Sequence, residues 1–138
     1  MIKDTICVIE TNIDDMSPVV YESLFEKLYN AGALEVFMTS VYMKKMRPGV
    51  LLSVLSPKDK LNSMAELILR ETTSFGIRYY ETRRLKLRRK KKTVGGGKLG
   101  KIRVTEGYLG QKLIKASGEY RDLVRASARH KTPLKDLL

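Results

Sequence analysis

The chain has 138 residues, of which 43% are hydrophobic and 30% are charged, a balance typical of a globular domain and not of a disordered chain. Its formal net charge is +12, and it has one cysteine and one histidine. The single cysteine excludes a disulfide within the chain. One cysteine and one histidine also argue against a complete nickel, zinc or copper site, because such a site draws on several His or Cys ligands. No apolar run reaches the roughly 18 residues of a membrane span, and no signal-peptide pattern is expected.

The expected elements of the first 82 residues follow one another in the order β-α-β-β-α-β. Strands are expected over residues 6–11, 34–42, 50–55 and 77–81, which are short and rich in apolar and β-branched side chains. The first helix begins at Ser17-Pro18 and ends at Gly32, and the second begins at Ser56-Pro57. This order is typical of an α+β ferredoxin-like sandwich, with two helices over one antiparallel sheet, and we assign it to a domain at residues 1–82.

Residues 83–138 are expected to extend the same domain. Strands at 84–94 and 98–109 form a basic β-hairpin around Gly95-Gly96-Gly97, and a strand at 112–116, a helix at 119–130 and a short helix from Pro133 follow. Residues 83–92 hold eight basic residues and no acid, and the rest of the chain has a net charge of only +4. The sequence therefore localises the positive charge to this run, which we place near the tip of the hairpin.

The first polar cluster, Glu10 to Asp15, lies between the first strand and the first helix. Its carboxylates and its amide are oxygen ligands of the kind that Mg²⁺ and Mn²⁺ prefer. The alternative is that Asp14 and Asp15 only complement the positive end of the following helix.

The other two clusters offer contacts to phosphate. Lys44 to Gly49 places two ammonium groups and a guanidinium on a tight turn, which suits a polyphosphate, although a solvated turn is the alternative. Arg70 to Arg78 offers three hydroxyls and a glycine at a helix end, where helix capping and a surface ion pair are the alternative. None of the standard nucleotide-binding loop motifs occurs in the sequence.

RNA binding by the basic run is a separate hypothesis. A sheet that recognises RNA displays aromatic side chains in a characteristic pattern for stacking on bases, and this sequence lacks that pattern. We therefore do not expect nucleic acid to be the main partner.

Taken together, the three clusters resemble successive motifs of one family, the LarC nickel-insertion proteins of nickel-pincer cofactor biosynthesis. The resemblance covers nearly the whole chain. The matching segments are Glu10 to Pro18, Gly32 to Val36, Tyr42 to Lys45 with Arg47-Pro48-Gly49, Arg70 to Thr73 with Gly76 and Arg78, Glu119-Tyr120, and Pro133 to Lys135.

The resemblance implies a CTP-dependent cyclometallase of the lyase class. Such a protein inserts nickel into the pyridinium-3,5-bisthiocarboxylic acid mononucleotide precursor of the lactate racemase cofactor. This chain resembles the C-terminal half of the family, so nickel would be supplied by a His-rich N-terminal half, and no nickel ligand is expected here. The implied assembly is a cytoplasmic homo-oligomer, a trimer or a hexamer.

The resemblance also gives the clusters their roles. CTP would bind with Mg²⁺ or Mn²⁺, and the precursor's phosphate would attack a phosphorus of CTP, helped by positioning and charge neutralisation. The residues expected to hold the phosphates are Lys44, Lys45, Arg47, Arg70, Arg78, Thr72 and Thr73, and those expected to hold the divalent ion are Glu10, Asp14, Asp15 and Glu71.

Two other functions fit the same sequence features. One is a non-catalytic ferredoxin-like module that binds RNA or a protein partner through the basic hairpin. The other is an oligomerisation domain that nucleotide regulates. The fold alone does not separate these functions from nickel insertion.

Overall fold

The computed structural model describes residues 1–95 and 97–138, which form two compact units. The ferredoxin-like unit is Asp4–Arg84, and the basic unit is Leu85–Leu138 with Met1–Lys3. None of the helices within the described ranges has the length and apolar composition that a membrane span requires. The assignment of residues 83–138 as an extension of the first domain stays a prediction.

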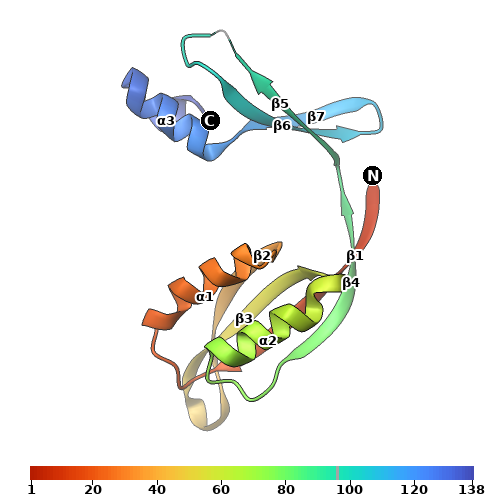
Figure 1. Ribbon diagram of the computed structural model, residues 1–138, viewed down its shortest axis with the longest axis vertical. Coiled ribbons are helices and arrows are strands. Elements are labelled where there is room, and N and C mark those ends of the chain that lie inside the picture. The colour runs from red at the N-terminus through yellow and green to blue at the C-terminus, as the bar shows by residue number, and fades with distance from the viewer. Residues whose placement is uncertain (96) are drawn as a thin grey trace. The chain divides into compact units, whose positions relative to one another are not determined.

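The ferredoxin-like unit contains a four-stranded sheet and two helices (Figure 1). The strands pair in the order β2-β3-β1-β4, and β3 runs antiparallel to both of its neighbours. This arrangement confirms the α+β ferredoxin-like fold. The elements in chain order are β1 Ile2–Ile13, α1 Val19–Asn30, β2 Glu35–Tyr42, a 3₁₀ turn at Lys44–Met46, β3 Pro48–Pro57, a 3₁₀ turn at Lys58–Lys60, α2 Leu61–Glu71 and β4 Arg78–Lys86.

The core lies between one face of this sheet and the two helices. Ile9 of β1 is paired with Val54 of β3, so the two side chains point to the same face, and both are fully buried. Each fully buried aliphatic side chain contributes about 1.5–3 kcal/mol to folding. The helices complete the core with Leu24, Leu28, Met64 and Ile68.

The ends of the helices show where local sequence rules hold and where they fail. Gly32 ends α1 as expected, with a φ of 104°, and Ala33 N–H donates to the Leu28 carbonyl oxygen at 3.0 Å. The second helix begins at Leu61, after the 3₁₀ turn, so the expected start at Ser56-Pro57 is wrong. Ser56 is instead the last fully buried residue of β3, and its hydroxyl donates to the Pro57 carbonyl oxygen at 2.9 Å.

The basic unit contains a three-stranded sheet in the order β5-β6-β7 and a helix at its C-terminal end. Residues 84–94 do not form one strand as expected. Arg84, Leu85 and Lys86 belong to β4, and the next strand begins at Arg88. The cations Arg88–Lys92 lie along β5, paired with β6, and not near the hairpin tip. Gly96, in the expected turn, lies outside the described residues. The elements are β5 Arg88–Val94, β6 Ile102–Leu109, β7 Lys112–Gly118, α3 Tyr120–His130 and a 3₁₀ turn at Leu134–Asp136.

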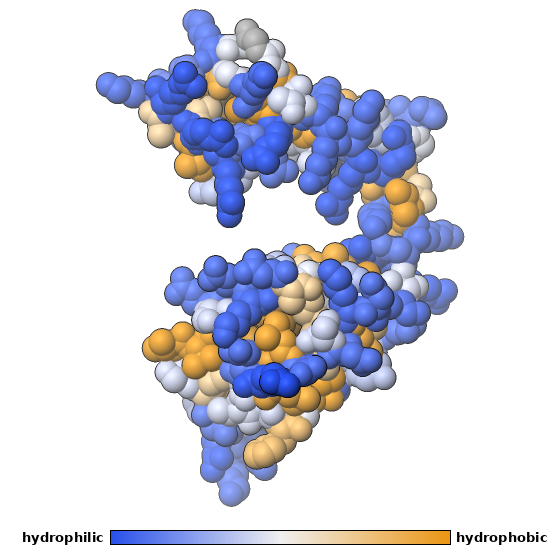
Figure 2. Space-filling model, in the orientation of Figure 1, coloured by the Kyte–Doolittle hydropathy of each residue, from blue (hydrophilic) through white to orange (hydrophobic). Residues whose placement is uncertain are grey.

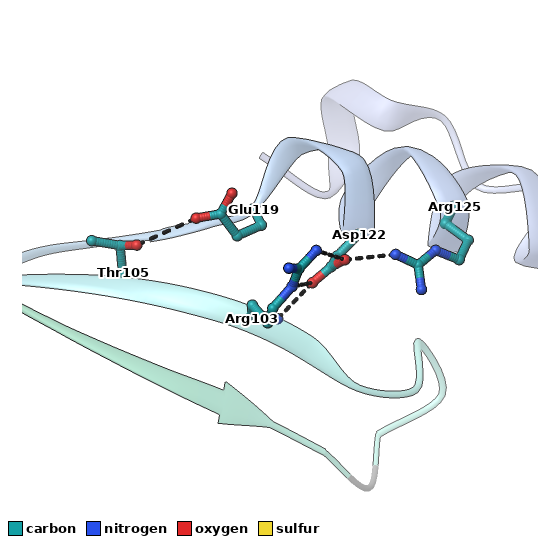
Figure 3. A network of polar contacts seen from close by, with 5 residues as sticks. All are labelled: Arg103, Thr105, Glu119, Asp122 and Arg125. Atoms are coloured by element: carbon teal, nitrogen blue, oxygen red, sulfur yellow. Dashed lines mark hydrogen bonds and ion pairs between the residues drawn. The ribbon is translucent and has the colours of Figure 1, made fainter. Parts of the chain in front are cut away.

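A buried carboxylate fastens α3 to β6 (Figure 3). Asp122 of α3 accepts hydrogen bonds from Arg103 Nε at 2.9 Å, Arg103 Nη2 at 2.8 Å, the Arg103 backbone N–H at 2.9 Å and Arg125 Nη2 at 2.7 Å. These contacts, the Arg103 side chain first, hold the pKa of Asp122 well below its usual range. The ionised carboxylate is therefore part of the folded structure.

Because the pKa of Asp122 is lowered by folding, its contribution to stability is present above the unfolded-state pKa of about 3.9 and is lost at lower pH. We expect the Arg103 amide to lose protection from hydrogen exchange as pH falls below about 4. The Asp122→Asn variant should lower that protection at neutral pH and flatten its pH dependence, whereas Asp136→Asn, at an exposed carboxylate of the same unit, should change neither. Identical pH profiles for all three proteins would contradict this role for Asp122.

Candidate functional site

Three loops of the ferredoxin-like unit meet at one end of its sheet. We call this end the loop edge and define it by residues 14–17, 43–47 and 72–77. Ile13 at the end of β1 is paired with Val50 near the start of β3, which brings the first two loops together. The Thr11 hydroxyl donates to the Gly76 carbonyl oxygen at 3.2 Å, which brings in the third. The fold thus brings part of each of the three polar clusters of the sequence to one edge.

Gly49 sets how closely the turn before β3 approaches β1. A Cβ atom at this position would lie 2.7 Å from the Ile13 carbonyl oxygen, 2.6 Å from Met43 Sδ and 3.3 Å from Asp14 Cβ. A methionine side chain can move, but the backbone oxygen of a paired strand cannot move without breaking its pairing. Glycine is therefore required for the turn to rest against the end of β1.

The turn itself presents cations on a strained backbone. Lys45 and Met46 have φ values of 60° and 58°, a conformation that costs a side-chain-bearing residue on the order of 1–3 kcal/mol. Lys44 and Lys45 are exposed, and neither ammonium group has a hydrogen bond or ion pair with any residue that the structure describes. Arg47 lies 3.7 Å from the largely buried Asp14 carboxylate, measured from Nη1 to Oδ2. Strain of this kind is concentrated at functional sites.

The first and third loops are joined by a short hydrogen bond. Thr73 Oγ1 donates to Asp15 Oδ1 at 2.6 Å, and the Thr72 hydroxyl donates to the Ile68 carbonyl oxygen at 2.7 Å, which caps α2. Burial and the nearby Asp15 carboxylate raise the pKa of Tyr21. Thr72 is thus occupied with its own helix, whereas Thr73 orients an acidic group of the loop edge.

A second polar group lies on the face of the sheet opposite the helices. Arg78 Nε donates to Glu10 Oε2 at 3.0 Å, and Arg78 Nη1 donates to Asn12 Oδ1 at 2.6 Å. The Tyr80 hydroxyl donates to Glu10 Oε1 at 3.2 Å, and burial, together with this carboxylate, raises the pKa of Tyr80. The sequence clusters contained Glu10, Asn12 and Arg78, with the Asn12 amide as an expected oxygen ligand of the divalent ion, but Tyr80 was not assigned a role. The alternation of strand residues would have found Tyr80, because it lies two residues from Arg78.

Two of the expected site residues are paired elsewhere. Arg70 Nη2 lies 2.7 Å from Glu66 Oε1 on the same helix, and the Arg70 side chain is 74% exposed. Glu71 Oε2 lies 2.7 Å from Lys27 Nζ of α1. The structure therefore brings together Asp14, Asp15, Lys44, Lys45, Arg47 and Thr73, and it gives Arg70 and Glu71 other partners.

The comparisons with known proteins decide which family this arrangement represents. The family model described as nickel insertion protein matches residues 1–138. The chain belongs to the nickel insertion protein family. It is 45% identical over 133 residues to the pyridinium-3,5-bisthiocarboxylic acid mononucleotide nickel insertion protein of Acetivibrio thermocellus, covering 96% of this chain and 32% of that protein. Its identity to the protein of the same description from Desulfitobacterium hafniense is 38% over 129 residues, covering 94% and 32%. The chain spans about a third of the length of these relatives.

A solved structure identifies the part of the family to which the chain is similar. It is LarC2, described as the C-terminal domain of a cyclometallase involved in the synthesis of the NPN cofactor of lactate racemase, in the apo form. The TM-score is 0.89 at 30% identity, over 99% of this chain and 93% of LarC2. A protein of Methanopyrus kandleri shares the fold, with a TM-score of 0.67 at 19% identity over 97% and 84% of the two chains. The resemblance noted from the sequence motifs is confirmed.

The central strands of this family member offer no stacking surface for bases. β1 and β3 occupy the middle of the four-stranded sheet, and neither contains Phe, Tyr or Trp. RNA-recognition sheets place their stacking aromatics on such central strands. The open face presents instead the polar group formed by Glu10, Asn12, Arg78 and Tyr80.

The close approach at Gly49 predicts a specific loss of stability. Gly49→Ala should lower the free energy of unfolding by about 1–3 kcal/mol, because the new methyl group must displace the turn from the end of β1. The matched control is Gly76→Ala at the same edge, where a Cβ meets nothing within 4 Å. It should be neutral or should stabilise by up to about 1 kcal/mol. Denaturant unfolding measures both, and equal stabilities would show that the turn does not depend on this contact.

Proposed function

We propose that this chain is the CTP- and divalent-metal-binding domain of a nickel insertion protein. The whole protein would load nickel, as a substrate, into a pyridinium-3,5-bisthiocarboxylic acid mononucleotide. Family membership and the printed names of the relatives support the reaction class. Because the relatives are about three times as long as this chain, we assign the nickel ligands to their additional part, which the resemblance predicts to be rich in histidine.

The observation that carries the proposal is the exposed cations of the loop edge. Lys44 and Lys45 have no acidic partner among the described residues, and their turn is held in a strained conformation by β1. Two unpaired ammonium groups beside a guanidinium form a compact positive surface, for which a triphosphate is the matching ligand. We therefore assign the phosphate contacts to Lys44, Lys45 and Arg47.

The acidic residues of the loop edge fit a divalent ion that also binds phosphate. No group of three or more His, Cys, Asp or Glu in the described part of the chain can enclose a metal ion by itself. Mg²⁺ needs no such group, because it retains water and is held by one or two carboxylates together with substrate phosphates. Asp14 and Asp15 would supply those carboxylates, whereas Glu10 and Glu71 are held by Arg78 and Lys27.

The chemistry that these residues support is transfer at phosphorus. When bound, the divalent ion neutralises charge on the triphosphate. Lys44, Lys45 and Arg47 would bind and orient the phosphates, so that a phosphate oxygen of the mononucleotide can bond to a phosphorus of CTP while the bond from that phosphorus to the departing phosphate or pyrophosphate breaks. The Thr73 hydroxyl, which bonds Asp15, would hold that carboxylate in place. In this account the domain contributes positioning and charge, and no side chain acts as a nucleophile.

Nucleotide binding predicts a shift in thermal stability. The midpoint of unfolding should rise with CTP and Mn²⁺, and much less with CMP and Mn²⁺, because most of the charge contact is to the outer phosphates. At ligand a hundredfold above its dissociation constant, the stabilisation is about 2.7 kcal/mol. The absence of a shift with any nucleoside triphosphate, for folded protein with metal present, would refute the nucleotide site.

A pair of lysine variants tests the position of the site. Lys45→Ala should weaken binding of Mn²⁺-CTP by roughly 1–3 kcal/mol, the contribution of a charge-assisted bond to phosphate. Lys58→Ala is the matched control, because Lys58 is also exposed but lies beyond the opposite end of β3 and pairs with Glu81. Titration calorimetry should find its affinity unchanged, and an equal loss in both variants would place the nucleotide elsewhere.

A further inference from the structure

The two units of the chain carry very different charges. Of the 27 basic and 15 acidic residues, 17 and 4 lie in the basic unit, so that its formal net charge is +13 and that of the ferredoxin-like unit is −1. Hydrophilic residues cover most of the visible surface of the basic unit (Figure 2). The excess charge therefore extends beyond the run at residues 83–92, and the nucleotide site proposed at the loop edge does not account for it.

Part of this charge lines a cavity within the basic unit. The cavity has a volume of about 270 Å³, close to the lower limit of about 300–1,000 Å³ for ligand pockets. Lys91 and Arg103 contribute two cations, and Thr93 and Thr105 contribute two hydroxyls, all from one face of the sheet; the Lys92 side chain points to the other face. Glu119, at the start of α3, contributes one carboxylate. The residues around the cavity are Lys91, Lys92, Thr93, Arg103, Val104, Thr105 and Glu119.

One of the two cations is fixed by a buried carboxylate. Arg103 is held by Asp122 through Nε and Nη2. The Asp122 side chain is only 4% exposed, whereas that of Arg103 is 60% exposed. The acid is thus hidden from solvent while the cation faces it. Cations held in place before a ligand arrives lose less side-chain entropy on binding, which favours a site over a diffuse charged surface.

Lys91 adds the charge that the buried acid does not balance. It is exposed, and no hydrogen bond or ion pair joins its ammonium group to another described residue. Lys91 and Thr105 are register partners on β5 and β6, so their side chains share one face of the sheet, and Thr93 and Arg103 form the neighbouring pair on that face. The face therefore presents an ammonium, a guanidinium and two hydroxyls. A phosphate monoester accepts hydrogen bonds from donors of this kind. The Thr105 hydroxyl also donates to Glu119 at 3.5 Å, and that carboxylate is a natural acceptor for ribose hydroxyls.

From these observations we infer a second anion site, distinct from the loop edge, whose ligand is a mononucleotide with its phosphate toward Lys91 and Arg103. The inference deepens the proposed function and rests on it only for the identity of the mononucleotide. That mononucleotide is the precursor that the relatives' names describe, a pyridinium mononucleotide with further acidic groups. The loop edge would then hold CTP, and this cavity would bind the second substrate before its phosphate reacts with CTP. The concave shape, and the absence of aromatic residues among its lining, favour a small anion over single-stranded RNA.

The test uses the whole chain and nicotinic acid mononucleotide, a pyridinium mononucleotide that carries one carboxylate. Titration calorimetry compares the parent chain with Lys91→Glu and with Lys112→Glu, an equal change of charge on an exposed lysine of β7 outside the cavity. Lys91→Glu should weaken binding about tenfold or more, because it replaces a charge-assisted bond with repulsion, and Lys112→Glu should change affinity less than about twofold. Thr93→Val, which leaves the charge unchanged, should also weaken binding.

The outcomes separate this inference from the proposed function. No binding of the probe at millimolar concentration, or equal losses in Lys91→Glu and Lys112→Glu, would overturn the second site. Tighter binding of a short single-stranded RNA, lost equally in both lysine variants, would identify a nucleic-acid surface instead.

Mn²⁺-CTP is titrated on the same proteins and should bind all of them alike. If CTP binds none of them while the probe responds as expected, the loop-edge site fails and the second site stands. If Lys91→Glu abolishes binding of both ligands, CTP binds at this cavity and not at the loop edge, and the assignment of the two ligands to separate sites is wrong.

Discussion

The close contact between Gly49 and the Ile13 carbonyl oxygen determines the geometry of the loop edge. Because no side chain intervenes, the turn at residues 43–47 rests directly on the end of β1. Asp14 can then lie 3.7 Å from Arg47, and Lys44 and Lys45 are exposed on the same turn as Arg47. The strain at Lys45 and Met46 is maintained because the paired strands on both sides of the turn leave it little freedom. The proposed phosphate binding depends on this backbone contact as much as on the cations.

Most of the fold could be predicted because its signals are local. Alternation of buried residues and the glycine at the end of α1 were sufficient for the order of the elements and for the ferredoxin-like class. Two errors have physical causes that local patterns do not carry. Ser56-Pro57 has the composition of a helix start, but pairing with Ile6 and Cys7 of β1 keeps it in β3. The basic segment reads as one strand, but it is shared between two sheets, with Leu87 at the break.

The candidate site was only partly predictable, because side-chain pairing depends on contacts distant in sequence. The convergence of the three loops follows from the topology, and the sequence clusters anticipated it. The partner of Glu71 is 44 residues away on another helix, and that of Arg78 is 68 residues away on another strand. The cavity near Lys91 could not be found from sequence either, because it depends on the pairing of β5 with β6 and on the buried Asp122 that holds Arg103. A run of cations does not show which of them are held by hidden acids.

The central claim is that the triphosphate binds at the loop edge. Amide resonances of the isotope-labelled chain, followed during a titration with Mg²⁺-CTP, test this claim most directly because they report on every loop at once. The account predicts saturable shifts at residues 14–15, 44–47 and 72–76, and only small shifts at residues 91–93 and 103–105. Shifts confined to the second group, or spread evenly over the basic unit, would contradict it.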